Sequence, residues 1–197
     1  MNGGKEEEVL LKSKEVKEDN DWSHDGRFLF YTAADPKTKF DIWVLPLKGN
    51  KTPFPFLATE FYESKAAISP DGRWVAYTSN ETGRSGSEVY VRSFAMNSDG
   101  TAVKTGGKWQ VSKAGGFGSR WRADGRELYY RGGGGVMAVE IATVPSFRAG
   151  KSQTLGFDPQ WAFTPSADGQ RFLVQADVNG KPDPHEVILN WQAALKK

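Results

Sequence analysis

The 197-residue sequence contains no cysteine, only two histidines and no long apolar run. Without cysteine there is no disulfide framework, no thiolate chemistry and no zinc site with cysteine ligands. Because His24 and His185 are the only histidines, a multi-histidine metal site within one chain is excluded, and one shared between two chains is disfavoured. No window approaches the roughly 18 apolar residues that a membrane helix needs. The opening residues, MNGGKEEEVLLKS, are not those of a signal peptide.

The sequence also lacks a strong charge of either sign. It carries 26 basic and 24 acidic residues, for a formal net charge of +2. This balance shows no electrostatic footprint for nucleic acid, and we expect no nucleic-acid partner and no membrane segment in this chain. These absences leave the cellular compartment open.

The sequence does contain four copies of one hairpin motif. The copies are WSHDGRFLFY at 22–31, ISPDGRWVAY at 68–77, WRADGRELYY at 121–130 and a worn form, PSADGQRFLV, at 165–174. Asp-Gly favours a tight turn because glycine reaches positive φ and aspartate bonds its own backbone. The predicted structural turn residues are Asp25, Gly26, Asp71, Gly72, Asp124, Gly125, Asp168 and Gly169. We expect the four aspartates to lie on one rim, too dispersed for a single metal ion.

The spacing of the repeat predicts a β-propeller. The turn aspartates are 46, 53 and 44 residues apart, close to the period of propeller blades. A third strand is predicted at 41–45, 88–91, 136–139 and 186–189, and a fourth at 55–57, 109–111 and 153–155. Four strands per repeat is the composition of a blade. The sequence therefore predicts one all-β domain over 1–197, with repeats at about 13–57, 58–111, 112–155 and 156–191.

The two ends of the chain suggest how the propeller closes. Residues 9–11 are predicted to form a lone strand of the fourth kind, whereas 187–191 form a third strand with no fourth strand after it. Pairing these two ends would complete the last blade and remove two open sheet edges. Either four blades close within one chain, or a homodimer closes a ring of eight blades by exchanging strands.

A cluster around the third hairpin is the predicted binding surface. Arginine and aromatic side chains together are typical of such surfaces. The candidate residues for an anionic or peptide partner are Arg120, Trp121, Arg122, Arg126, Tyr130 and Arg131.

Other conspicuous residues are predicted to have structural roles. Asp41 and Glu88 begin third strands, and the seven tryptophans recur at similar repeat positions, as expected for packing between blades. The sequences around Ser85 and Ser119 lack the G-x-S-x-G pattern of a serine nucleophile. The glycine run 132–135 precedes a strand, so it is a turn and no phosphate cradle. We predict no catalytic residue, no metal site and no cofactor.

The motifs W-S-x-D-G-R, I-S-P-D-G-R-W-V-A-Y and D-I-W-V resemble TolB-type propeller repeats, relatives of the WD-repeat blades. Three segments are similar to the propeller at the C-terminal end of bacterial serine/threonine protein kinases, especially acidobacterial ones. They are GGKEEEVLLKS at 3–13, GKWQVSKAGG at 107–116 and VILNWQAALKK at 187–197. In such kinases a catalytic domain and a membrane segment precede the propeller, which would lie outside the cytoplasmic membrane. No kinase motif occurs in this sequence.

The resemblance implies a non-catalytic sensor or interaction module, a fragment of a larger kinase, that binds a protein, peptide or small molecule. The alternative is a metal-dependent hydrolase of the lactonase or phosphotriesterase type, with calcium at the propeller centre or dimer interface. Such a site needs several carboxylate and amide oxygens converging on the axis. The predicted innermost strands, near 20–21, 66–67, 118–119 and 163–164, supply few such groups. The interaction module is therefore the favoured interpretation.

Overall fold

The chain is described by a computed structural model that covers residues 9–12, 14–82, 86–96, 106–159, 162–178 and 181–189, with backbone only at 176–178 and 181–189. The described residues form sixteen β-strands and no helix. No helix in this part of the chain could therefore span a membrane. The prediction of an all-β fold is confirmed.

The strands form four antiparallel sheets that follow the order of the repeats. Sheet 1 contains β1 (Lys17–Trp22), β2 (Phe28–Asp35), β3 (Lys39–Pro46) and β4 (Phe54–Leu57). Sheet 2 contains β5 (Glu63–Ile68), β6 (Trp74–Ser79), β7 (Glu88–Ser93) and β8 (Lys108–Gln110). Sheet 3 contains β9 (Phe117–Trp121), β10 (Glu127–Gly132), β11 (Gly135–Ala142), β12 (Arg148–Ala149) and β13 (Gln153–Thr154). Sheet 4 contains β14 (Phe163–Pro165), β15 (Arg171–Val178) and β16 (Lys181–Leu189).

Each Asp-Gly hairpin is closed by its own side chains. In sheet 2 the Ser69 hydroxyl donates to Asp71 Oδ1 over 2.5 Å and accepts the backbone N–H of Trp74 over 2.9 Å. The same serine-aspartate bond occurs in the turns of sheets 1 and 4. Gly72 has a φ of 71°, which L-residues with a Cβ adopt only with strain. The sequence thus specifies these turns locally, before any contact between sheets.

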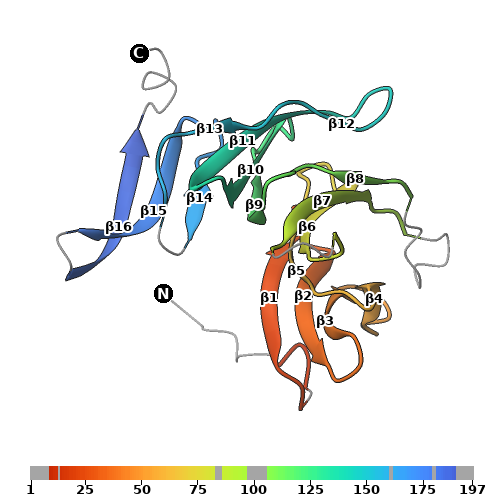
Figure 1. The fold of residues 1–197 in the computed structure, drawn as a ribbon. Coiled ribbons are helices and arrows are strands. Elements are labelled where there is room, and N and C mark those ends of the chain that lie inside the picture. Colours follow the sequence, from red (N-terminus) through yellow and green to blue (C-terminus); the bar gives the residue numbers. More distant parts are fainter. Residues whose placement is uncertain are drawn as a thin grey trace, which may run out of the picture.

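The sheets are stacked face to face along an arc (Figure 1), and buried side chains fill each interface. Between sheets 1 and 2 the cluster includes Phe28, Phe30, Ile42, Tyr77 and Phe94. Between sheets 2 and 3 it includes Ala76, Val91, Leu128, Tyr130 and Val139. Between sheets 3 and 4 it includes Tyr129, Val136, Phe163, Phe172 and Val174. Alternating residues of the strands in sheets 2 and 3 therefore face the two neighbouring sheets, as the period of a strand requires.

The first strand of each sheet lies on the inner side of the arc, where β1, β5, β9 and β14 are neighbours in turn. The pairing register shifts at Asn20 in β1 and again within β5 and β9. The bulge lets Asn20 Oδ1 accept both the Thr32 hydroxyl, at 2.8 Å, and the Ala66 N–H of the next sheet, at 3.2 Å. Bulges on the inner strands thereby join one sheet to the next.

The predicted strand at 9–11 is wrong. Residues 9–12 form no strand, and Leu11 packs on the outer face of sheet 1, against Tyr31 and Leu45. Burial of the leucine on this apolar face replaces the predicted pairing with the last strand. Among the described residues β16 pairs with β15 alone, and no closing pair is formed. Closure across a homodimer stays a prediction.

The tryptophan prediction needs correction at two positions. Trp74, Trp109 and Trp121 are partly buried and pack between sheets 2 and 3 as expected, whereas Trp43 packs on the outer face of sheet 1. Trp22, in contrast, is 52% exposed at the end of the inner strand β1. Trp161 and Trp191 lie outside the described residues. Residues 148–149, which lie outside the predicted strands, form the short strand β12 against β11.

Candidate functional site

Two hollows open on the side of the sheets that carries the Asp-Gly turns. The first, which we call the inner cavity, has a volume of about 260 Å³ and is lined by residues of all four inner strands and their turns. Its polar and aromatic lining includes Asp21, Trp22, His24, Arg120 and Trp121. This is the place where the alternative interpretation would require a calcium ion.

The carboxylate and amide oxygens at the inner cavity already have partners. Asp21 Oδ2 accepts the Ile68 N–H at 2.9 Å, and Oδ1 accepts the Trp22 N–H at 2.8 Å. Burial raises the pKa of Asp21 above its ordinary value despite these bonds. Its neighbour Asn20 bridges sheets 1 and 2 in the same way. Asp21 Oδ2 and Asn20 Oδ1 therefore join sheet 1 to sheet 2.

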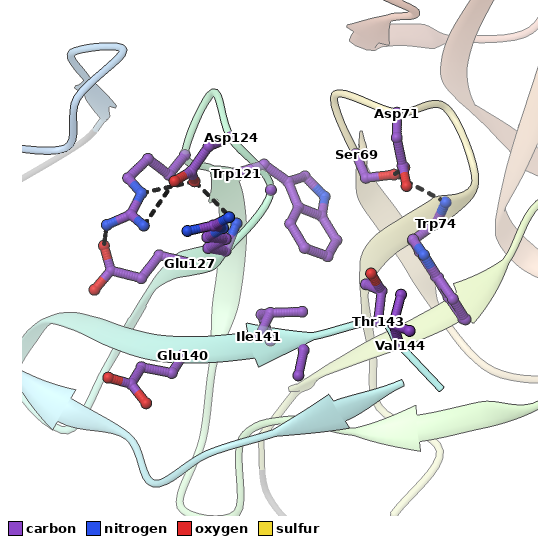
Figure 2. A pocket seen from close by; sticks show the side chains of 14 residues that line it. Ser69, Asp71, Trp74, Trp121, Asp124, Glu127, Glu140, Ile141, Thr143 and Val144 are labelled. Carbon is purple, nitrogen blue, oxygen red and sulfur yellow. Dashed lines mark hydrogen bonds and ion pairs between the residues drawn. The ribbon is translucent and has the colours of Figure 1, made fainter. Parts of the chain in front are cut away.

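The second hollow, which we call the groove, lies between the turns of sheets 2 and 3 and has a volume of about 620 Å³. Figure 2 shows Trp121 between the Asp124 turn and the Ser69–Asp71 turn, with Ile141, Thr143 and Val144 below them. Ser69 and Trp121 line both hollows, so the groove and the inner cavity are adjacent. The Trp121 Nε1 donates to the Ala67 carbonyl at 3.0 Å, which fixes the indole where the hollows meet.

The turn of sheet 3 departs from the other copies at one residue. Ser23, Ser69 and Ser166 occupy the position before the turn in the other copies, and Arg122 occupies it in sheet 3. Two Arg122 nitrogens, Nε and Nη2, bond the two Asp124 oxygens at 2.7 and 2.8 Å. A third, Nη1, bonds Glu127 Oε2 at 2.7 Å. The Arg122 guanidinium lowers the pKa of Asp124 below its usual range.

Because Arg122 replaces the serine and bonds Asp124, Arg126 lacks the side-chain partner that the equivalent arginines have. In sheets 1 and 2 the corresponding Arg27 and Arg73 donate from Nε to their turn aspartates, at 2.6 and 2.8 Å. In sheet 3 the aspartate is bonded by Arg122. The exposed Arg126 side chain forms no ion pair with any residue that the structure describes. The groove therefore holds one guanidinium that the hairpin itself does not use.

The six predicted binding residues are not brought to one surface. Trp121, Arg122 and Arg126 line the groove, and Arg120 lies with Trp121 at the inner cavity. Tyr130 is buried between sheets 2 and 3, with its hydroxyl bonded to Ser152 Oγ at 2.7 Å. Arg131 pairs with Asp158 and lies over the Phe117 ring. Tyr130 and Arg131 are separated because neighbouring residues of β10 point to opposite faces of the sheet.

Several lining residues were not among the sequence candidates, notably Asp21, Trp22, Trp74 and Ile141. Only the packing of one repeat on the next brings them together. One signal was readable in the sequence: the serine of WSHDGR, ISPDGR and PSADGQ is an arginine in WRADGR. A residue that differs from its equivalents in the other repeats indicates a position that does not share their structural role.

The remaining sequence candidates lie in structural contacts. Asp41 Oδ2 accepts the Thr38 hydroxyl at 2.7 Å, and Glu88 accepts the Ser112 hydroxyl. The glycine run forms the turn from β10 to β11, and Ser119 is buried. Ser85 and the His185 side chain lie outside the described residues. Across the described side chains, no group of three or more histidine or acidic residues is placed to hold a metal ion.

Comparison with solved structures shows the fold. TolB from Acinetobacter baumannii matches with a TM-score of 0.66 and 18% identity, over 92% of this chain and 43% of that one. A Bacteroides uniformis protein described as a 6-phosphogluconolactonase matches with a TM-score of 0.54 and 17% identity, over 88% of this chain and 55% of that one. A Bacteroides fragilis protein described likewise has a TM-score of 0.50 and 16% identity, over 81% and 48% of the two chains.

These similarities establish a TolB-like β-propeller fold and leave the activity open, because the identities are low. The chain spans about half the length of each of these proteins. No protein-family model matches the chain. No curated protein matches it significantly.

Proposed function

We propose that the chain is a non-catalytic propeller module that binds a protein, peptide or small-molecule ligand. The module belongs to a larger sensor kinase of the type that its sequence resembles. Its contact surface is the side that carries the Asp-Gly turns, where the inner cavity and the groove meet at Trp121. Binding residues of proteins commonly lie on loops that a rigid scaffold holds in place.

The bonding of the inner-strand oxygens is the observation that carries this proposal. Asp21 and Asn20 use their oxygens to join sheet 1 to sheet 2. What the inner cavity offers to a ligand is instead the exposed Trp22 indole and the Arg120 guanidinium. Arg120 Nη1 donates to the neighbouring carbonyl, that of Ser119, at 2.9 Å. Aromatic and arginine side chains at a partly open site are suited to contact with a partner.

The alternative, a calcium-dependent lactonase, rests on the fold that the chain shares with proteins described as 6-phosphogluconolactonases. It would require the Asp21 oxygens, which already accept the Ile68 and Trp22 N–H groups, to bind the ion as well. Hard cations such as calcium take six or more oxygen ligands. Supplying them here would draw on groups that already stabilise the fold.

Three measurements on the same protein separate the interpretations. The module should show no rise of melting temperature with calcium and no hydrolysis of 6-phosphogluconolactone, and a random peptide library should yield binders that weaken on Trp22→Ala. A ligand that binds only the folded state must raise its stability. Calcium-dependent lactone hydrolysis, with a calcium-dependent rise in melting temperature, would replace the module with the enzyme.

A further inference from the structure

We propose that a third hollow, between sheets 2 and 3, binds a small anion with an apolar body, namely a carboxylate on a short apolar chain. This hollow, which we call the rear pocket, has a volume of about 370 Å³, within the range of small-molecule sites. It shares no lining residue with the inner cavity or the groove. The inference therefore goes beyond the proposed function and adds a second site to the module.

The rear pocket lies at the other end of the strands from the Asp-Gly turns. β10 leads from the Asp124 turn to the turn at Gly133, and its six residues span roughly 20 Å. Gly133 lines the pocket together with Gly115, which belongs to the loop from β8 to β9. The two segments approach closely, because a Cβ at Gly132 would lie 2.5 Å from the Gly115 carbonyl oxygen. Both sheets therefore contribute to the walls of the pocket.

The floor of the rear pocket is apolar. Val111 follows β8 of sheet 2, and Tyr130 and Met137 are directly paired residues of β10 and β11 in sheet 3. All three side chains belong to the cluster that packs sheet 2 on sheet 3. The pocket is thus a place where this core reaches the surface. An apolar chain bound there would be removed from water, which favours binding.

The charged residues that line the rear pocket are both cations. Lys113 comes from the loop after β8 and Lys151 from the loop between β12 and β13, so each sheet contributes one. No carboxylate is among the lining residues, and neither lysine forms an ion pair within the described part of the chain. The groove, in contrast, has four carboxylates and two guanidiniums in its lining. The charge of the rear pocket therefore selects an anionic ligand.

The polar groups around the rear pocket agree with this choice. The nearby Glu88 is buried, and its carboxylate accepts the Ser112 hydroxyl and, at 3.1 Å, the Gly115 N–H. Two lysines against this one carboxylate leave the surroundings positive. The Tyr130 hydroxyl donates to Ser152 Oγ at 2.7 Å. Because Ser152 is exposed and lines the pocket, its own hydroxyl hydrogen can be donated to a bound carboxylate.

Octanoate is the probe that tests the rear pocket, with binding followed by the backbone amide signals of the full chain in heteronuclear NMR. We expect millimolar octanoate to shift the signals of Gly115, Gly133 and Ser152 in a saturable way. Acetate has the charge without the apolar body, and 1-octanol has the body without the charge. Each should bind about fivefold or more weakly than octanoate, because each loses one of the two contributions.

Substitutions at the rim of the pocket test the charge separately. Lys113→Ala and Lys151→Ala should each weaken octanoate binding about two- to fivefold, as expected for exposed ion pairs. Lys48→Ala is the matched control, because it removes an exposed lysine from the loop between β3 and β4 and lines none of the three hollows. Ala114→Glu, at an exposed lining position, should weaken binding similarly. Ala114→Gln, which has the same size without the charge, should not.

The outcomes separate this inference from the proposed function. Equal affinities for octanoate and 1-octanol, or undiminished affinity in both lysine variants, overturn the anionic character of the ligand. Octanoate shifts that centre on the Trp22 indole instead would overturn the rear pocket and support ligand binding at the inner cavity. The absence of any shift at millimolar octanoate rejects the rear pocket and leaves the peptide measurements on Trp22→Ala unaffected.

Discussion

Phe172 is the residue whose removal best tests the packing of sheet 4 on sheet 3. The side chain is fully buried and meets Tyr129 edge-on at 5.0 Å and Phe157 at 5.2 Å between ring centroids. Replacing a buried phenylalanine by alanine costs about 3–5 kcal/mol, because transfer energy is lost and a cavity remains. For a domain of this size the melting temperature should fall by roughly 6–20 °C.

Leu173 is the matched control for Phe172→Ala. It follows on the same strand but points to the outer face of sheet 4 and is 44% exposed. Leu173→Ala should therefore change stability by roughly 1 kcal/mol or less. Thermal unfolding followed by circular dichroism, with hydrogen exchange to locate the loss, measures both variants. Equal effects of the two substitutions would refute the stacking of these sheets through the Phe172 cluster.

Three further substitutions test the turns and the buried charges. Gly169→Ala should destabilise the fold more than Gly72→Ala, since both have φ near 70° but only at Gly169 would a Cβ lie 2.2 Å from Tyr129 Oη; equal chemical-denaturation midpoints would contradict this. Ser69→Ala should cost about 1–3 kcal/mol in urea unfolding through lost turn hydrogen bonds, and a neutral effect would speak against the turn geometry. Burial, with the nearby Asp41 charge, raises the pKa of Glu63 in the folded protein. The contribution of this carboxyl group to the free energy of unfolding is therefore complete below its unfolded pKa of about 4.3, and it is lost as pH rises through the folded pKa. Unfolding free energies of Glu63→Gln relative to wild type should therefore increase as pH rises from about 4.3, and parallel pH profiles would disprove the assignment.

The hairpins were predictable because they are specified locally. Asp71, Gly72 and Ser69 form their turn with bonds inside six consecutive residues. The alternation of Phe28, Leu29 and Phe30 likewise indicates which residues face a neighbouring sheet, and the structure buries Phe28 and Phe30 together. The number of repeats and the all-β class follow from such local signals.

Features that depend on packing between repeats were not predictable. The sequence predicts a strand at Leu11, because a short apolar run does not indicate which surface of the fold will cover it. Trp22 resembles the other repeat tryptophans in sequence, yet its strand ends at the inner cavity. Arg126 matches Arg27 and Arg73 in sequence, and only the position of the Arg122 guanidinium shows that its partner is taken.

The reactivity of individual arginines toward phenylglyoxal, followed by mass spectrometry on the wild-type chain, tests the central claim that Arg122 replaces Arg126 as the side-chain partner of Asp124 in sheet 3. Arg27 and Arg73 are 58% and 65% exposed at their side chains, yet they donate to turn aspartates. Arg126 should therefore be modified faster than either, and Arg122→Ser should slow it to their rate. Modification of Arg126 no faster than Arg27 and Arg73 would contradict the claim.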